Sequence, residues 1–113
     1  MEGKDVQVHD ELIAVDFSIL PWTPQRVFTV IASEDSQHRG NHLAGCNQFV
    51  TLICGNVSFY VTEEGKSEAV ITLKNRGESI FITSTSYVKY TLHEKNSTIL
   101  VLADRPYEVR ESI

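Results

Sequence analysis

Short apolar runs, separated by polar residues and turns, follow one another along most of this 113-residue chain. Within several runs apolar and polar residues alternate, and β-branched and aromatic side chains are frequent. This pattern predicts β-strands, because successive residues of a strand project to opposite faces of a sheet. No window has the period of about 3.6 residues that marks an amphipathic helix. The predicted strands cover residues 12–19, 26–31, 48–54, 56–62, 69–73, 79–83, 87–92 and 98–103.

The runs recur roughly every 8–12 residues, which is typical of a sandwich, a jelly roll or a barrel. Between the first strands, the polar stretch 32–40 is expected to be a break. A single domain over residues 1–113 is expected, because the chain is too short for two. The polar residues 1–10 leave two alternatives open, a mobile arm or an arm exchanged with another chain. The polar tail, residues 105–113, is expected to lie outside the barrel.

Composition and charge narrow the class of partner. Apolar residues make up 42% of the chain, an ordinary share for a protein with its own core. The net charge of −5 argues against nucleic acid as a partner, although one Arg is enough to bind a phosphate. No apolar run is long enough to span a membrane, and the first residues lack the apolar core of a signal peptide. We therefore expect a cytoplasmic protein with no membrane partner.

The candidate chemistry begins at His42. The spacing from His42 through Ala44 and Gln48 to Gly55 matches the first motif of cupin barrels, H-x-H-x3-4-E-x6-G. A metal site in a barrel needs three or four converging ligands, of which two usually stand at i and i+2 of one strand. Ala44 cannot be a ligand and Gln48 is a poor one. The sequence therefore predicts no metal and no other cofactor.

Two neighbouring residues could carry acid–base chemistry. An imidazole changes its protonation near neutral pH, so His42 on an inward-facing strand is suited to moving a proton next to a carbonyl. Arg39 offers a planar set of donors to a phosphate or a carbonyl oxygen. The alternative is plainer: His42 makes one ordinary hydrogen bond, and Arg39 pairs with a carboxylate.

Beyond these residues, the chain resembles the sugar 3,4-ketoisomerase cupins, the WxcM-like family. The resemblance lies in the order and spacing of several modest motifs. They are Leu20-Pro21-Trp22 with Pro24 to Phe28, Arg39-Gly40-Asn41-His42, Cys46-Asn47-Gln48, Ile53-Cys54-Gly55, Leu100 to Ala103, and Tyr107-Glu108.

The resemblance implies an all-β, single-domain cupin with an RmlC-like jelly-roll barrel. It also implies metal-free catalysis and a homodimer whose N-terminal strands exchange between subunits. Members act on a dTDP-4-keto-6-deoxyhexose for bacterial surface polysaccharides. They move its carbonyl between C4 and C3 through an enediol. By this resemblance we predict His42 and Arg39 as catalytic residues, and Arg26, Asn41, Gln48 and Tyr87 as substrate-binding residues.

The chain departs from the family at positions that matter for catalysis. Ala44 stands where the family has a second His, Gly45 where it has Lys, and Phe28 and Thr29 where it has tyrosines. We favour an enzyme, a sugar-nucleotide ketoisomerase or epimerase. Two alternatives are open: a barrel that binds a nucleotide sugar or a partner enzyme without turnover, and a small dimeric barrel with a vestigial pocket.

Overall fold

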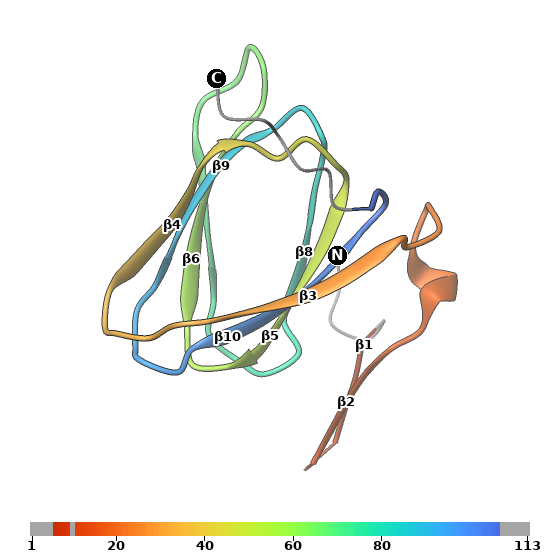
Figure 1. The fold of residues 1–113 in the computed structure, drawn as a ribbon, viewed down its shortest axis with the longest axis vertical. Helices are drawn as coiled ribbons and strands as arrows, with labels where there is room; N and C mark the ends of the chain where they lie inside the picture. The colour runs from red at the N-terminus through yellow and green to blue at the C-terminus, as the bar shows by residue number, and fades with distance from the viewer. Residues whose placement is uncertain (1–5, 10, 107–113) are drawn as a thin grey trace.

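Two four-stranded antiparallel sheets face one another in the computed structural model, which describes residues 6–9 and 11–106 (Figure 1). One sheet has the strand order β3-β10-β5-β8 and the other β4-β9-β6-β7. The strands of the first sheet are β3 (Arg26–Ile31), β10 (Thr98–Ala103), β5 (Gln48–Cys54) and β8 (Ser79–Ile82). Those of the second are β4 (Gln37–Leu43), β9 (Tyr87–Leu92), β6 (Val57–Thr62) and β7 (Ala69–Leu73).

Neighbours in each sheet are mostly not neighbours in sequence, so the chain crosses repeatedly between the two sheets. That topology is the one expected of a jelly roll. The all-β, cupin-type jelly roll predicted from the sequence is thereby confirmed.

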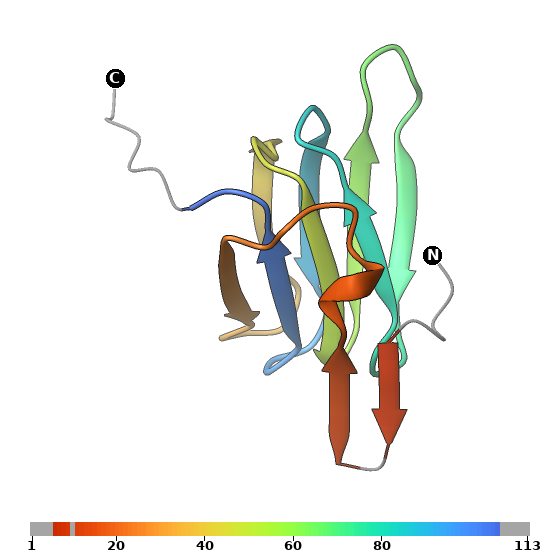
Figure 2. The ribbon, with the colours of Figure 1, turned by 90° about the vertical axis from the view of Figure 1, so that its right-hand side faces the viewer.

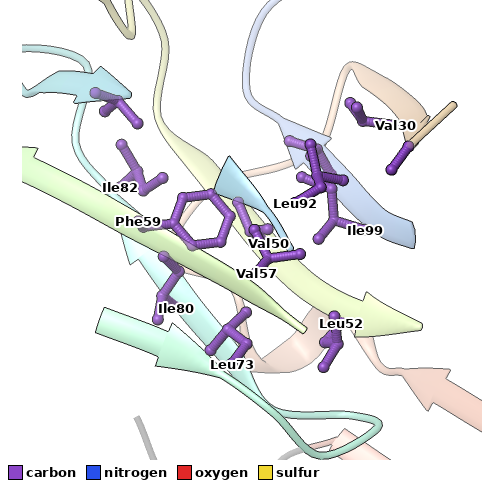
Figure 3. Packing of buried hydrophobic residues seen from close by; sticks show 13 residues of the cluster. Val30, Val50, Leu52, Val57, Phe59, Leu73, Ile80, Ile82, Leu92 and Ile99 are labelled. Atoms are coloured by element: carbon purple, nitrogen blue, oxygen red, sulfur yellow. The ribbon is translucent and has the colours of Figure 1, made fainter. Parts of the chain in front are cut away.

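The core fills the space between the sheets. Inward positions alternate along each strand, as the period of two requires, and they carry the fully buried Leu52, Phe59 and Leu92 (Figure 3). Burying a side chain of this size contributes about 1.5–3 kcal/mol relative to leaving it exposed. The packing of these residues from both sheets fixes which face of each strand points inward.

A separate hairpin covers part of the outer face of the β3-β10-β5-β8 sheet. It consists of β1 (Val6–His9) and β2 (Leu12–Val15), which pair antiparallel with each other and extend away from the two sheets (Figures 1 and 2). Val6 is buried against Phe49 and Leu102 of the sheet. Of the predicted N-terminal arm, residues 6–9 therefore form a strand, while residues 1–5 and 10 lie outside the described residues.

Seven of the eight predicted strands match observed strands closely. The eighth, expected over 12–19, ends at Val15 and is followed by a 3₁₀ turn, η2 (Phe17–Ile19). Two strands were not predicted, β1 and β4. The prediction of a break over 32–40 was wrong for its second half, since β4 begins at Gln37. Its polar composition suits an edge strand, which exposes most of its side chains to water.

Candidate functional site

A β-bulge in β4 determines how the two predicted catalytic residues are presented. Arg39 pairs with Tyr90 and His42 with Val88, and both partners pack toward the core. Residues three apart in a regular strand point to opposite faces. Here the register shifts between Gly40 and His42, so one extra residue brings Arg39 and His42 to the same inner face. Both side chains are exposed to solvent, within reach of a ligand.

The backbone of the bulge requires unusual residues. Gly40 has φ +82° and Asn41 has φ +71°, in the left-handed region that Gly and Asn adopt most readily. A Cβ at Gly40 would also lie 2.9 Å from the carbonyl oxygen of Val88, which is too close. The Gly-Asn pair is therefore the local sequence signal for the bulge.

The hydrogen bond of His42 determines which ring nitrogen carries the hydrogen when the ring is neutral. Its Nδ1 lies 2.8 Å from the carbonyl oxygen of Leu43. A carbonyl oxygen can only accept, so Nδ1 carries the hydrogen and donates it. Nε2 is then left with a lone pair in the neutral ring. An exposed imidazole in this form can take up a proton at Nε2.

Two of the predicted substrate-binding residues lie in one row on the facing sheet. Arg26 pairs with Ala103, and Ala103 pairs with Gln48, so all three project to the same side. This side is inward, because Val101 of β10 and Val50 of β5 are core residues two positions along from this row. The Arg26 guanidinium lies 4.4 Å from the centroid of the Phe28 ring.

The loop between β4 and β5 joins the two groups and is firmly held. The Asn47 side chain donates to the Asp104 carboxylate at 2.8 Å, and its backbone N–H donates to the same carboxylate at 2.9 Å. The Asn47 side-chain oxygen in turn accepts from the backbone N–H of Ser84 at 2.9 Å. His42 and Gln48, at the two ends of this loop, are therefore at the same end of the molecule.

Asn41 and Tyr87, the other two predicted substrate-binding residues, are placed differently. Tyr87 pairs with Leu43, the neighbour of His42, and so projects from the outer face. Its hydroxyl lies 2.9 Å from the carbonyl oxygen of Asn41 and 2.7 Å from the Asn41 side-chain oxygen. The structure thus brings Arg39, His42, Arg26 and Gln48 to inner faces, and it joins Asn41 and Tyr87 to each other on the outside.

The inner face also contains residues that were not among the predicted site residues. Tyr90, opposite Arg39, stacks on Phe59 with ring centroids 5.1 Å apart. The alternation of residues 88, 90 and 92 was the signal that could have placed it inward. Ala44, at the position of the family's second His, packs against the core with Phe28.

A hollow of about 530 Å³ lies over the second sheet. Most of its side chains project from the outer face, away from His42, as their pairing in rows shows. The histidine that lines this hollow is His38, whose Nδ1 is 2.9 Å from the Thr91 hydroxyl. The lining residues are His38, Arg39, Gly40, Asn41, Tyr60, Glu68, Lys89, Tyr90 and Thr91.

Neither a metal-ligand cluster nor a spanning helix is present in the described part of the chain. Over residues 6–9 and 11–106, no three His, Cys, Asp or Glu side chains converge as ligands would. No helix within these ranges has the length and apolar character needed to cross a membrane. Cys46 and Cys54 are free thiols.

Solved structures with the same fold include several sugar ketoisomerases. The WlaRB TDP-quinovose 3,4-ketoisomerase from Campylobacter jejuni superposes with a TM-score of 0.79 at 20% identity, covering 92% of this chain and 84% of that one. A 3,4-ketoisomerase from Helicobacter canadensis gives 0.78 at 19% identity, over 92% and 80%. The sugar 3,4-ketoisomerase QdtA from Thermoanaerobacterium thermosaccharolyticum, solved with TDP, gives 0.77 at 18%, over 92% and 83%.

At these identities the likeness shows the fold, and a comparison with curated proteins found no match. The family is shown by a different comparison. A family model described as "FdtA: WxcM-like, C-terminal" matches residues 4–113, nearly the whole chain. The chain belongs to the WxcM-like, C-terminal family of cupin-fold proteins.

Proposed function

We propose that this protein is a metal-independent sugar-nucleotide ketoisomerase that acts on a dTDP-linked 4-keto-6-deoxyhexose in surface-polysaccharide synthesis. The family and the ketoisomerase structures of the same fold support an isomerase of this general class. The observation that carries the proposal is the state of His42: an exposed imidazole whose Nδ1 donates to a carbonyl, leaving Nε2 as a base.

The proposed reaction is a balanced proton transfer. His42 Nε2 removes the C3 hydrogen of the sugar as a proton, the electron pair of that bond forms a C3–C4 double bond, and the C4 carbonyl oxygen takes up a proton from water. The enediol then loses the proton of its C3 hydroxyl to water, and C4 gains the proton held on His42. The carbonyl has moved from C4 to C3 with no net change in atoms. Arg39, a cation on the same face, stabilises the negative charge that develops on oxygen.

The facing sheet supplies binding groups. Arg26 offers donors to a phosphate or a sugar oxygen, and Gln48 offers an amide that can donate and accept. Asn41 and Tyr87 were also predicted to bind substrate, and this stays a prediction. The TDP bound in the QdtA structure supports a nucleoside diphosphate as part of the ligand.

Ala44 changes how this chain must carry out the reaction. Without a second imidazole at that position, His42 would return to C4 the proton it took from C3. Both transfers would then occur on one face of the sugar ring. Some of the hydrogen from C3 would be carried directly to C4 before it exchanges with solvent.

The test is deuterium exchange in D2O, followed by NMR on dTDP-4-keto-6-deoxyglucose. We expect exchange at C3, loss of about 10²–10⁴-fold in rate for His42→Ala, and partial carry-over to C4 when C3 is labelled. His38→Ala is the matched control, because His38 is on the same strand but bonds Thr91 on the outer face. Equal loss in both variants, or no exchange in the unaltered protein, would refute the proposal.

A second candidate is a barrel that binds a nucleotide sugar or a partner enzyme without turnover. It is favoured by Ala44 and Phe28, which place packed apolar groups where the family has reactive ones. The same NMR samples separate the two functions. Binding of the dTDP sugar without exchange at C3 would support this candidate.

We also propose that the partner is a second copy of the chain. Val27 and Ile31 of β3 are each 60% exposed on the outer face of the first sheet, and Phe17, which lines a hollow together with Val27, is 59% exposed. Apolar side chains gathered in this way are typical of an interface. Sedimentation of a monomer at micromolar concentration would contradict a homodimer. The cytoplasmic location stays a prediction.

A further inference from the structure

The outer side of the β4 bulge is tied to β9 next to His42. Asn41 is the extra residue of the bulge, without a partner in the ladder between Gly40 and His42. The Tyr87 hydroxyl contacts Asn41 twice, at 2.9 Å to the backbone oxygen and 2.7 Å to the side-chain oxygen. These contacts hold a non-glycine residue in the left-handed conformation, which is otherwise unfavourable.

One hydroxyl hydrogen can make a single strong hydrogen bond, so it cannot satisfy both oxygens equally well. Oxygen and nitrogen of an Asn amide are assigned from hydrogen bonding, and a half-turn of the Asn41 amide places its NH₂ at 2.7 Å from the hydroxyl. The hydroxyl then donates to the backbone carbonyl and accepts from the amide. With this orientation both contacts are good hydrogen bonds, and Tyr87 and Asn41 form a closed pair.

Contacts from Tyr87 of β9 and from Ser86, the residue before β9, hold the backbone on both sides of His42. Tyr87 binds Asn41, the residue before it, and the carbonyl of Ser86 accepts from the backbone N–H of Ala44 at 2.9 Å. Between these two points lies Leu43, whose carbonyl fixes the His42 ring through Nδ1. If the first point is released, the bulge can relax, and the direction of the Leu43 carbonyl is no longer fixed.

We infer that Tyr87 and Asn41 are positioning residues: their outer-face hydrogen bonds hold the β4 bulge that keeps His42 on the inner face with a basic Nε2. In this role they act through the backbone, and the role requires no contact with the reacting sugar. The inference builds on the proposed role of His42 as the proton-transfer group.

The test measures the tautomer of His42 by the ¹⁵N chemical shifts of its two ring nitrogens, which needs no substrate. In the unaltered protein the hydrogen is expected on Nδ1. In Tyr87→Phe, which keeps the ring and removes the hydroxyl, the signal is expected to shift toward the Nε2–H form that a histidine side chain favours in water. The rate of C3 exchange is expected to fall about 10–100-fold with little change in KM, as for a misplaced catalytic group.

Two further variants make the result specific. Tyr60→Phe removes a hydroxyl from the same outer face, one strand further away, and is expected to leave the His42 tautomer unchanged. Asn41→Gly accepts positive φ without help from a side chain, so the double variant Tyr87→Phe with Asn41→Gly is expected to be no worse than Tyr87→Phe alone. Additive losses would point to independent roles and overturn the inference, as would a Tyr87→Phe spectrum identical to that of Tyr60→Phe.

The two proposals fail in different ways. If the tautomer shifts in Tyr87→Phe but the unaltered protein exchanges no C3 hydrogen, the proposed function is wrong and the positioning pair stands. If exchange is present and Tyr87→Phe changes neither rate nor tautomer, the function stands and the positioning pair is wrong.

Discussion

Strands β4 and β5 follow one another in the chain, but they differ in burial and in the regularity of their pairing. β5 lies inside its sheet between β10 and β8, and four consecutive residues, 49–52, are buried. β4 is the edge of the other sheet, none of its residues is buried, and its ladder is interrupted by the bulge. β5 therefore contributes to the core of the fold. β4 is exposed and irregular where it presents Arg39 and His42. Stability and proposed chemistry are thus separated by one short loop.

The largest effect should come from one substitution made in both strands. Leu52→Ala removes a side chain with no exposed surface and leaves a cavity, so we expect a loss of about 2–5 kcal/mol in unfolding free energy. Leu43→Ala, in β4, alters a residue that is 54% exposed and should change stability by no more than about 0.5 kcal/mol. Urea unfolding measures both. Similar losses would show that β4 is as important to the fold as β5.

A smaller effect should come from the backbone of the bulge. Gly40→Ala places a Cβ at 2.9 Å from the Val88 oxygen in a residue with positive φ, and we expect a loss of about 2–3 kcal/mol. Gly65→Ala is the control, because Gly65 has φ +75° but nothing within 4 Å of the added carbon. It should cost about 1 kcal/mol from φ alone. Equal losses in thermal unfolding would mean that the close approach to β9 contributes nothing.

The smallest effect concerns the turn that supports β5. Glu78 bonds Leu52 through its backbone, and its carboxylate accepts from the backbone N–H groups of Asn75 and Lys74, which lowers its pKa below 4.5. A lowered folded pKa means that the stabilisation is complete above about 4.5 and is lost as pH falls through the folded value.

Glu78→Gln should therefore cost less than about 1 kcal/mol at neutral pH, since the group is near the surface. The difference in melting temperature between the two proteins should shrink as pH falls from about 6 to about 3. A difference that does not change over this range would exclude the carboxylate as its cause.

The same contrast explains what the sequence could predict. β5 could be predicted because a buried strand must be apolar, and Thr51 is the one polar residue between Phe49 and Ile53. β4 was missed because an edge strand can be polar and because the bulge breaks the alternation on which the prediction depends. His42 and Arg39 were predicted from a motif, but their common face depends on Gly40 and Asn41. The row of Arg26, Ala103 and Gln48 depends on pairing between distant strands, which local pattern does not contain.

The bulge also determines how β4 tolerates the loss of one residue. Because residue 41 is surplus to the ladder, a deletion there would leave a regular strand with Arg39 and His42 still on one face. Retaining the residue while forcing it into the ladder would instead turn His42 outward. Deleting a residue from a strand normally disrupts its pairing severely. At residue 41, deletion is expected to disturb the inner face less than forcing the residue into the ladder. Relatives that differ by one residue at this point could therefore share the same inward histidine.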